Sequence, residues 1–226
     1  MEKKFNLHDL FGFLFPGSVL CAVVYAFLGR IGRVAPGQLD WSATLAMVPI
    51  AYVVGVLVHQ VGSWLLHEEK VAVSIMRDDD ATFTPAFKEK VREAFSEVFN
   101  LPALGDWSTR QTVFNSCYDY VAQQGKGIYV ENQYAIYSLC RSMIFVSAVA
   151  GALAVCLVAR RPTLAWLEYV VIVIIVGVTG GVIGIFWRGQ RRFIRHFAVG
   201  VYRAFYSAYC DSKLPRSPAP ARASDD

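Results

Sequence analysis

The chain has 226 residues, of which 55% are hydrophobic and only 18% are charged. Soluble domains carry about 25% charged residues, and the mean hydropathy of this chain is +0.38, so the composition indicates a membrane protein. The formal net charge of +4 is too small to indicate a nucleic-acid partner by itself. The five cysteines include no Cys-x-x-Cys pair and indicate neither a disulfide framework nor a zinc site. We expect no metal and no cofactor.

The first apolar stretch, residues 10–28, predicts a membrane-spanning helix, which needs about 20 mostly apolar residues. Pro16 and Gly17 interrupt its core and no Ala-x-Ala site follows, which argues against a cleaved signal peptide. We expect the residues before Pro16 to run along the membrane interface and the chain to kink there before it crosses. This span opens an N-terminal membrane hairpin over residues 1–66.

The second apolar stretch, residues 43–66, completes that hairpin and contains the most polar side chains deep in any span, His59 and Gln60. Ionisable residues inside a membrane are functional candidates by default. We expect His59 and Gln60 to line or latch the interior. Histidine can also sit neutral with one hydrogen bond, so a structural role and a proton or gating role are both open.

Residues 67–137 predict a small helical insert on the cytosolic side. Thr84 suits the N-cap of a helix and Pro85 its first turn. Two apolar stripes at helical spacing follow, one of Phe87, Val91, Phe95 and Val98 and one of Val113, Cys117, Tyr120 and Val121. About 70 residues make a weak independent core, so we expect the insert to pack against the membrane or another subunit.

The run RDDD, Arg77 to Asp80, lies inside this insert and raises the question of a metal site. No matching ligands recur nearby, so a solvated turn explains the run better. The chain also contains no P-loop, no Gly-x-Ser-x-Gly and no His-Glu-x-x-His.

A second membrane hairpin is predicted over residues 138–187, with spans at 142–159 and 164–187. The last span carries four glycines that allow helices to approach closely in lipid: Gly177, Gly180, Gly181 and Gly184. Similar small-residue spacing occurs in Ser147-x-x-x-Gly151 and Ala51-x-x-x-Gly55. Packing within the bundle and assembly of several copies into a homo-oligomer are both open.

Residues 188–211 predict a basic amphipathic helix rich in aromatic side chains, and residues 212–226 predict a disordered tail. We expect the arginines to lie on anionic lipid. These arginines are Arg188, Arg191, Arg192, Arg195 and Arg203. If both termini are cytoplasmic, most of the Lys and Arg residues that flank the four spans lie on the cytoplasmic side. Cytoplasmic loops carry an excess of these residues, so this orientation in a bacterial inner membrane is the predicted one.

Arg191-x-x-x-x-His196 matches the arginine–histidine spacing of HEPN ribonucleases. The preference for positive residues on the inner side already explains the arginines, and an arginine-rich segment matches the pattern by chance. We therefore expect no enzyme, with a membrane-tethered ribonuclease as an alternative that replacement of His196 by alanine would test.

The segments FNLHDLFGFLFPGSVL, AYVVGVLVHQVGSWLL and ENQYAIYSLCRSM together resemble a loose class of small multi-pass proteins from bacterial antiphage and CRISPR neighbourhoods. The shared features are Phe-Leu-x-Pro-Gly at Phe13–Gly17, Gly-x-x-x-His at Gly55–His59, and a helical insert before the third span. No catalytic residue is carried over with the likeness. The resemblance implies an effector that an upstream sensor triggers and that then perturbs the inner membrane.

These features together predict an all-α protein: an integral membrane four-helix bundle with a helical cytosolic insert and a basic juxtamembrane helix. The expected function is a membrane effector or accessory protein that oligomerises and perturbs membrane integrity when signalled through its cytosolic part. An alternative is a membrane anchor that recruits a soluble partner. The lipid bilayer is the expected surrounding in either case.

Overall fold

The computed structural model describes residues 7–32, 41–66, 74–100, 111–160 and 166–213, without the side chains of residues 41–44. Within these ranges the regular secondary structure is helical and no strand occurs, which confirms the all-α class. Most of the predicted tail over 212–226 lies outside the described residues.

The chain divides into two compact units. Unit 1 comprises Met1–Glu68 and Val130–Phe197, and unit 2 comprises Glu69–Tyr129 and Ala198–Asp226. Two helices continue across the boundaries: α6 (Ile128–Ala159) and α7 (Trp166–Lys213). The predicted second hairpin therefore starts earlier than residue 138.

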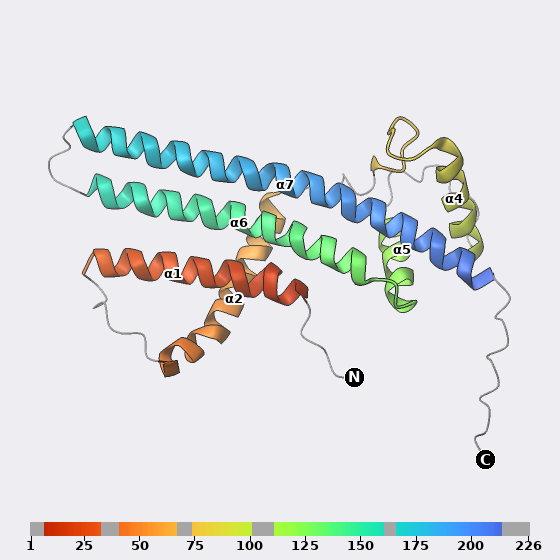
Figure 1. Cartoon of the computed structure of the whole chain (residues 1–226), viewed down its shortest axis with the longest axis horizontal. Helices are drawn as coiled ribbons and strands as arrows, with labels where there is room; N and C mark the ends of the chain where they lie inside the picture. Colours follow the sequence, from red (N-terminus) through yellow and green to blue (C-terminus); the bar gives the residue numbers. More distant parts are fainter. Residues whose placement is uncertain (1–6, 33–40, 67–73, 101–110, 161–165, 214–226) are drawn as a thin grey trace, which may run out of the picture. The chain divides into compact units, whose positions relative to one another are not determined.

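Unit 1 contains the π-helix η1 (Asp9–Leu14), α1 (Phe15–Arg30), α2 (Trp41–Leu65), most of α6 and the first part of α7. In Figure 1, α6 and α7 form a long antiparallel hairpin, and α2 crosses α1 steeply. The described residues contain four helices that are long and apolar enough to cross a membrane, within Asp9–Arg30, Leu45–Leu65, Ile128–Ala159 and Trp166–Lys213. Each predicted span falls on one of these helices.

Large apolar side chains cover the outside of unit 1. Leu45 and Leu57 on α2 are 65% and 60% exposed, and Val173 and Ile185 on α7 are 69% and 70% exposed. Soluble monomers rarely expose contiguous apolar surface of this kind. Apolar surface is unfavourable in water but not in the hydrocarbon core of a bilayer. These surfaces therefore support a membrane location for unit 1.

The first span stays helical through Pro16, where we expected the chain to kink. Residues 9–30 run as one helix whose first six residues are π-helical, and the Phe15 N–H bonds to the carbonyl of Leu10, five residues back. A proline ring clashes with the carbonyl four residues earlier in a regular α-helix. The wider π turn before Pro16 relieves this conflict, and the helix continues through the proline.

Unit 2 is a small helical module built from α4 (Pro85–Phe99), α5 (Gln111–Gln123) and the end of α7. The predicted cap is confirmed, because Thr84 Oγ1 accepts a hydrogen bond from Phe87 N at 3.3 Å. The centres of both apolar stripes, at Val91, Phe95, Val113, Cys117 and Val121, are buried.

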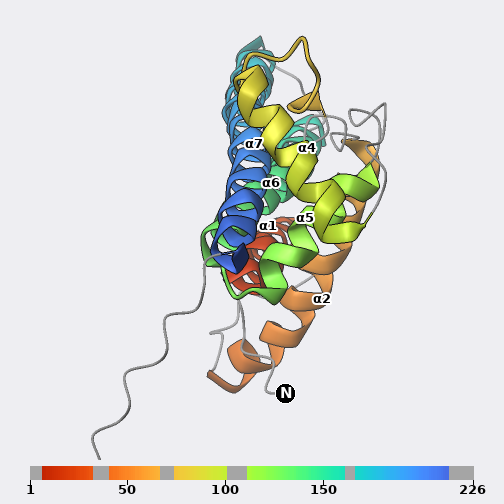
Figure 2. The ribbon, with the colours of Figure 1, turned by 90° about the vertical axis from the view of Figure 1, so that its right-hand side faces the viewer.

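The basic segment 188–211 is the continuation of α7 and not a separate helix. The end of this helix runs alongside α4 and α5 (Figure 2), and its aromatic rings contact rings on both of these helices. Phe205 is fully buried, with its ring centroid 5.4 Å from that of Tyr120. Tyr120 belongs to the second predicted apolar stripe. The aromatic residues at the end of α7 therefore form a protein core with that stripe and not a membrane-binding face.

Candidate functional site

Helices α1 and α2 approach so closely that glycine is required at two positions. A Cβ on Gly17 would stand 1.8 Å from the carbonyl oxygen of Ala51, and one on Gly55 would stand 1.8 Å from that of Phe13. Each neighbour is rigid backbone, so the contact has no room for a methyl group. The Ala51-x-x-x-Gly55 spacing thus serves packing within the chain, and it holds η1 and α1 against α2.

Beside this crossing lies a buried polar cluster, the Arg141 cluster, which we define as His8, His59, Tyr137, Ser138 and Arg141. Arg141 Nη2 lies 2.6 Å from His59 Nε2, and Ser138 Oγ lies 2.8 Å from His59 Nδ1. A guanidinium can only donate, so His59 Nε2 accepts. The ring is then neutral, and its Nδ1–H donates to Ser138.

Burial of the cluster is nearly complete at its centre. Arg141 is 6% exposed, His59 is 8% exposed and Ser138 is fully buried. The Arg141 guanidinium lies over the ring of Tyr137, with its central carbon 5.2 Å from the ring centroid. His59 is therefore buried inside unit 1, as expected. Gln60, for which the same was expected, is exposed. The buried side of α2 at this turn includes Val58 and His59, and the next step of 100° places Gln60 outside it.

The charge of Arg141 has no counter-ion among the residues that the structure describes. Its hydrogen-bond partners are the neutral ring of His59 and the hydroxyl of Tyr137, and no described carboxylate forms an ion pair with it. Buried charges in proteins are ordinarily paired, because an isolated one carries a large desolvation cost. Among the described residues, the hydrogen-bond partners of the guanidinium are therefore all neutral groups.

His8 closes the cluster from the start of the first span. Its ring stacks on Tyr134 with centroids 4.9 Å apart, and its centroid lies 6.0 Å from that of His59. The π-helix η1 follows His8 directly and carries Gly12 past α6, where Ser142 Oγ donates to the Gly12 carbonyl at 3.5 Å. Residues from η1, α2 and α6 thus meet at one level of unit 1.

The four glycines of α7 have no packing partner among the residues that the structure describes. A Cβ on Gly177, Gly180, Gly181 or Gly184 would meet no described atom within 4 Å. The tight contact between α6 and α7 uses Gly151 instead, where a Cβ would stand 2.6 Å from the Thr179 side chain. Packing within the bundle is therefore wrong for these four glycines, although the Ser147-x-x-x-Gly151 spacing does serve it.

Arg191 and His196 lie five residues apart on one continuous helix and are both exposed. Five residues turn an α-helix by about 140° from the starting direction, so the two side chains diverge within one chain. Arg191 lies over the Trp187 ring at 5.2 Å from its centroid. The other arginines of the predicted lipid-contacting set are also exposed: Arg188, Arg192, Arg195 and Arg203.

The RDDD turn is occupied by a cation from the protein itself. The Lys88 ammonium, on a residue only 2% exposed, donates to the carbonyls of Arg77 and Asp80, the latter at 2.6 Å. Asp78 pairs with Arg92 at 2.8 Å. A lysine that closes the turn explains the run as structural, and the described residues contain no cluster of three or more metal-binding side chains.

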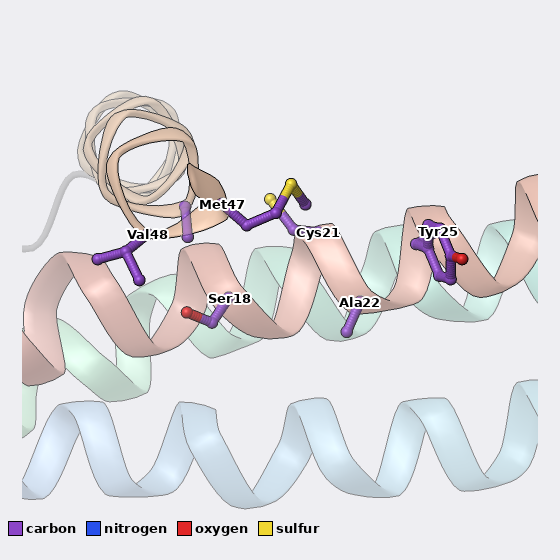
Figure 3. Close-up of a pocket in the computed structure, with 7 residues that line it drawn as sticks. Ser18, Cys21, Ala22, Tyr25, Met47 and Val48 are labelled. Atoms are coloured by element: carbon purple, nitrogen blue, oxygen red, sulfur yellow. The ribbon is translucent and has the colours of Figure 1, made fainter. Parts of the chain in front are cut away.

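An apolar pocket of about 310 Å³ opens between α1 and α2 (Figure 3). Its lining is almost entirely hydrocarbon and comprises Ser18, Cys21, Ala22, Tyr25, Met47, Val48 and Ala51. The Ser18 hydroxyl already bonds to the Leu14 carbonyl at 2.8 Å. The pocket offers no group for chemistry, and its lining suits an apolar chain.

The chain has no match among protein-family models, curated proteins or solved structures.

Sequence reasoning had singled out only His59 from the Arg141 cluster. A signal was present in α6, because Tyr134, Tyr137, Ser138 and Arg141 recur at helical spacing and give one polar stripe. A polar stripe that runs into an apolar span marks a buried network.

Proposed function

We propose that this protein is a multi-pass membrane effector, which assembles through the glycine face of α7 and perturbs the membrane when its cytosolic unit is engaged. The glycine face comprises Gly177, Gly180, Gly181 and Gly184. One observation carries the proposal: this face is open, while the chain's own close contacts use other glycines. Small residues four apart favour association of helices in lipid.

The direction of the glycine face supports assembly between copies. Thr179, which contacts α6, lies about 160° around the helix from Gly177. The glycine face is therefore turned away from α6, and neighbouring apolar residues such as Val173 are 69% exposed. A second copy of α7 could approach there to backbone distance without displacing any side chain of unit 1.

Helix α7 offers the route between signal and membrane. It runs unbroken from Trp166 to Lys213 and contributes to both units. We place unit 2 and both termini in the cytoplasm and unit 1 in a bacterial inner membrane, following the distribution of Arg and Lys.

Cysteine cross-linking in native membranes tests the assembly. In a background without the five native cysteines, Gly177→Cys should give a disulfide-linked dimer on mild oxidation. Val171→Cys is the matched control, since this exposed residue lies about 120° around the same helix from Gly177 and about 80° from Gly181, the nearest glycine of the face. Monomer alone from Gly177→Cys, or equal dimer from both variants, would contradict assembly through this face.

Membrane potential tests the effector role. Induced expression should depolarise cells that carry the trigger, and the double variant Gly180→Leu with Gly184→Leu should abolish depolarisation, because the leucines keep the helices apart. An unchanged potential in cells with the unaltered protein would reject the effector role even if dimers form.

A membrane anchor is the second candidate, and the separate core of unit 2 favours it. Phe205, Phe95 and Tyr120 give this unit an aromatic centre of its own, built from α4, α5 and the end of α7. Stable capture of one soluble protein from detergent extracts, with the membrane potential unchanged, would favour the anchor over the effector.

A further inference from the structure

One exposed stripe of α7 continues the glycine face into a row of arginines. Its members follow one another at intervals of four, three, four, three and four residues. At 100° per residue, all of them lie within about 40° of the direction of Gly177. Each of them is exposed. We call this set the α7 stripe, and it comprises Gly177, Gly181, Gly184, Arg188, Arg191 and Arg195.

The α7 stripe passes from the hydrocarbon to the headgroup level at Trp187. The largely apolar part of α7, from Trp166 to Trp187, is about 33 Å long at 1.5 Å per residue and matches a hydrocarbon core of about 30 Å. Tryptophan is enriched at the boundary of that core, and the Arg191 guanidinium lies 5.2 Å from the centroid of the Trp187 ring. The glycines of the stripe therefore lie within the hydrocarbon, and its arginines lie among the headgroups.

The arginines oppose the association that the glycines favour. Copies of a membrane protein insert in the same orientation, so a pair is related by a two-fold axis along the membrane normal, and each stripe faces itself. Arg188 lies only about 10 Å along the helix from Gly181. The two arginine rows then come within about 8 Å of each other, one Debye length at physiological salt, and repel. Between Glu168 and Asp211, α7 contains no acidic residue that could balance its row.

Anionic phospholipid has the chemistry to remove this repulsion. Its phosphate lies at the depth of the arginine row, and a guanidinium donates two parallel hydrogen bonds to phosphate oxygens. A headgroup with net negative charge also attracts basic residues beside the membrane surface. A zwitterionic headgroup carries its own cation and leaves the charge of the row in place. Net anionic lipid is therefore the occupant that fits between two such rows.

We infer that anionic phospholipid headgroups bridge the arginine rows of two copies, so that assembly through the glycine face requires anionic lipid. The inference rests on the proposed assembly of α7 and adds its lipid partner. In a bilayer of zwitterionic lipid alone, the arginine rows hold the copies apart. Where anionic lipid is present, the same rows strengthen the contact.

Cross-linking in vesicles of defined composition tests the lipid requirement. Full-length Gly177→Cys protein without the native cysteines is reconstituted, at one protein-to-lipid ratio, in phosphatidylcholine alone and in phosphatidylcholine with phosphatidylglycerol. The disulfide-linked fraction should be several-fold higher with phosphatidylglycerol. Equal dimer in both vesicles would overturn the lipid requirement and leave the assembly standing. Monomer alone in both would overturn the assembly and the inference with it.

A third arm identifies the source of the anion. Inorganic phosphate added to the phosphatidylcholine vesicles should leave the disulfide-linked fraction low, because a free anion is not held at the depth of the arginine row. A rise equal to that given by phosphatidylglycerol would show that a soluble anion suffices, and it would contradict bridging by lipid.

Charge removal separates bridging from a general effect of lipid on the protein. The double variant Arg188→Gln with Arg195→Gln should raise the dimer fraction in phosphatidylcholine and abolish the difference between the two lipids. Arg192→Gln with Arg203→Gln is the matched control, because these exposed residues carry the same charge but lie about 60° and 80° around the helix from Gly177. A lipid difference that persists in the first variant, or that vanishes equally in both, would contradict the inference.

Discussion

At the scale of single residues, this protein distinguishes glycines that the fold requires from glycines that it leaves open. Gly17 and Gly55 face rigid backbone, whereas Gly62 would place a Cβ 3.4 Å from Arg141 Cγ, an ordinary contact distance. All three lie in helices, where alanine is intrinsically favoured over glycine. Sterics therefore decide the outcome of a substitution.

We predict that Gly17→Ala and Gly55→Ala each destabilise unit 1 by about 3 kcal/mol or prevent folding, because the added methyl group forces α1 and α2 apart. Gly62→Ala should change stability by less than about 1 kcal/mol, since its added methyl group meets a side chain at normal distance. Thermal unfolding in detergent measures the difference. Equal effects at Gly55 and Gly62 would show that the close crossing is absent.

Lys88 gives a second prediction at this scale. Lys88→Met keeps the apolar stem but leaves the carbonyls of Arg77 and Asp80 without their donor, so it should cost about 1–3 kcal/mol. Lys90→Met is the matched control, because Lys90 is exposed on the same helix. Chemical denaturation followed by circular dichroism measures both, and a silent Lys88→Met would rule out its role in closing the turn.

At the scale of elements, local signals predicted helices well and their connections poorly. Thr84 and Pro85 marked the start of α4, and the apolar periodicity marked the buried faces of α4 and α5. Local patterns could not predict which helix packs against those faces. That helix is the end of α7, whose Phe205 meets Phe95 only through tertiary contact. Aromatic and basic residues mixed on one helix suggest lipid binding unless that contact is known.

The contact between α4 and the end of α7 carries a pH dependence. Glu97 accepts hydrogen bonds from Lys213, at 2.7 Å, and from Tyr209, and these hold the pKa of its carboxyl below the usual value of 4.5. A lowered pKa in the folded state means that this contribution is present above pH 4.5 and is lost as the pH falls through the folded pKa.

We expect Glu97→Gln to lower the melting temperature of unit 2 at neutral pH and to reduce its decline in acid. Glu93→Gln, at an exposed position on the same helix, should leave both unchanged. Melting curves recorded across the acid range provide the comparison. If the melting temperature fell equally with pH in the unaltered protein and in Glu97→Gln, the Glu97 contact would not be a source of the pH dependence.

At the scale of the whole molecule, composition and apolar runs were sufficient to predict an all-α chain with four candidate spans. The Arg141 cluster was not predictable in full, because its members come from residues 8, 59 and 137–141 and meet only when η1, α2 and α6 pack together. The uninterrupted course of α7 was also missed, since the change from apolar to basic residues at Arg188 resembles a helix boundary in sequence but leaves the backbone helical.

The central claim is that unit 1 is embedded in a lipid bilayer, and alkaline extraction of membranes tests it most directly. High pH strips peripheral proteins, whereas helices that cross the hydrocarbon core stay in the pellet until detergent is added. The account predicts that the full chain remains in the pellet at alkaline pH and enters solution only with detergent. Release into the supernatant as a monodisperse protein without detergent would contradict it.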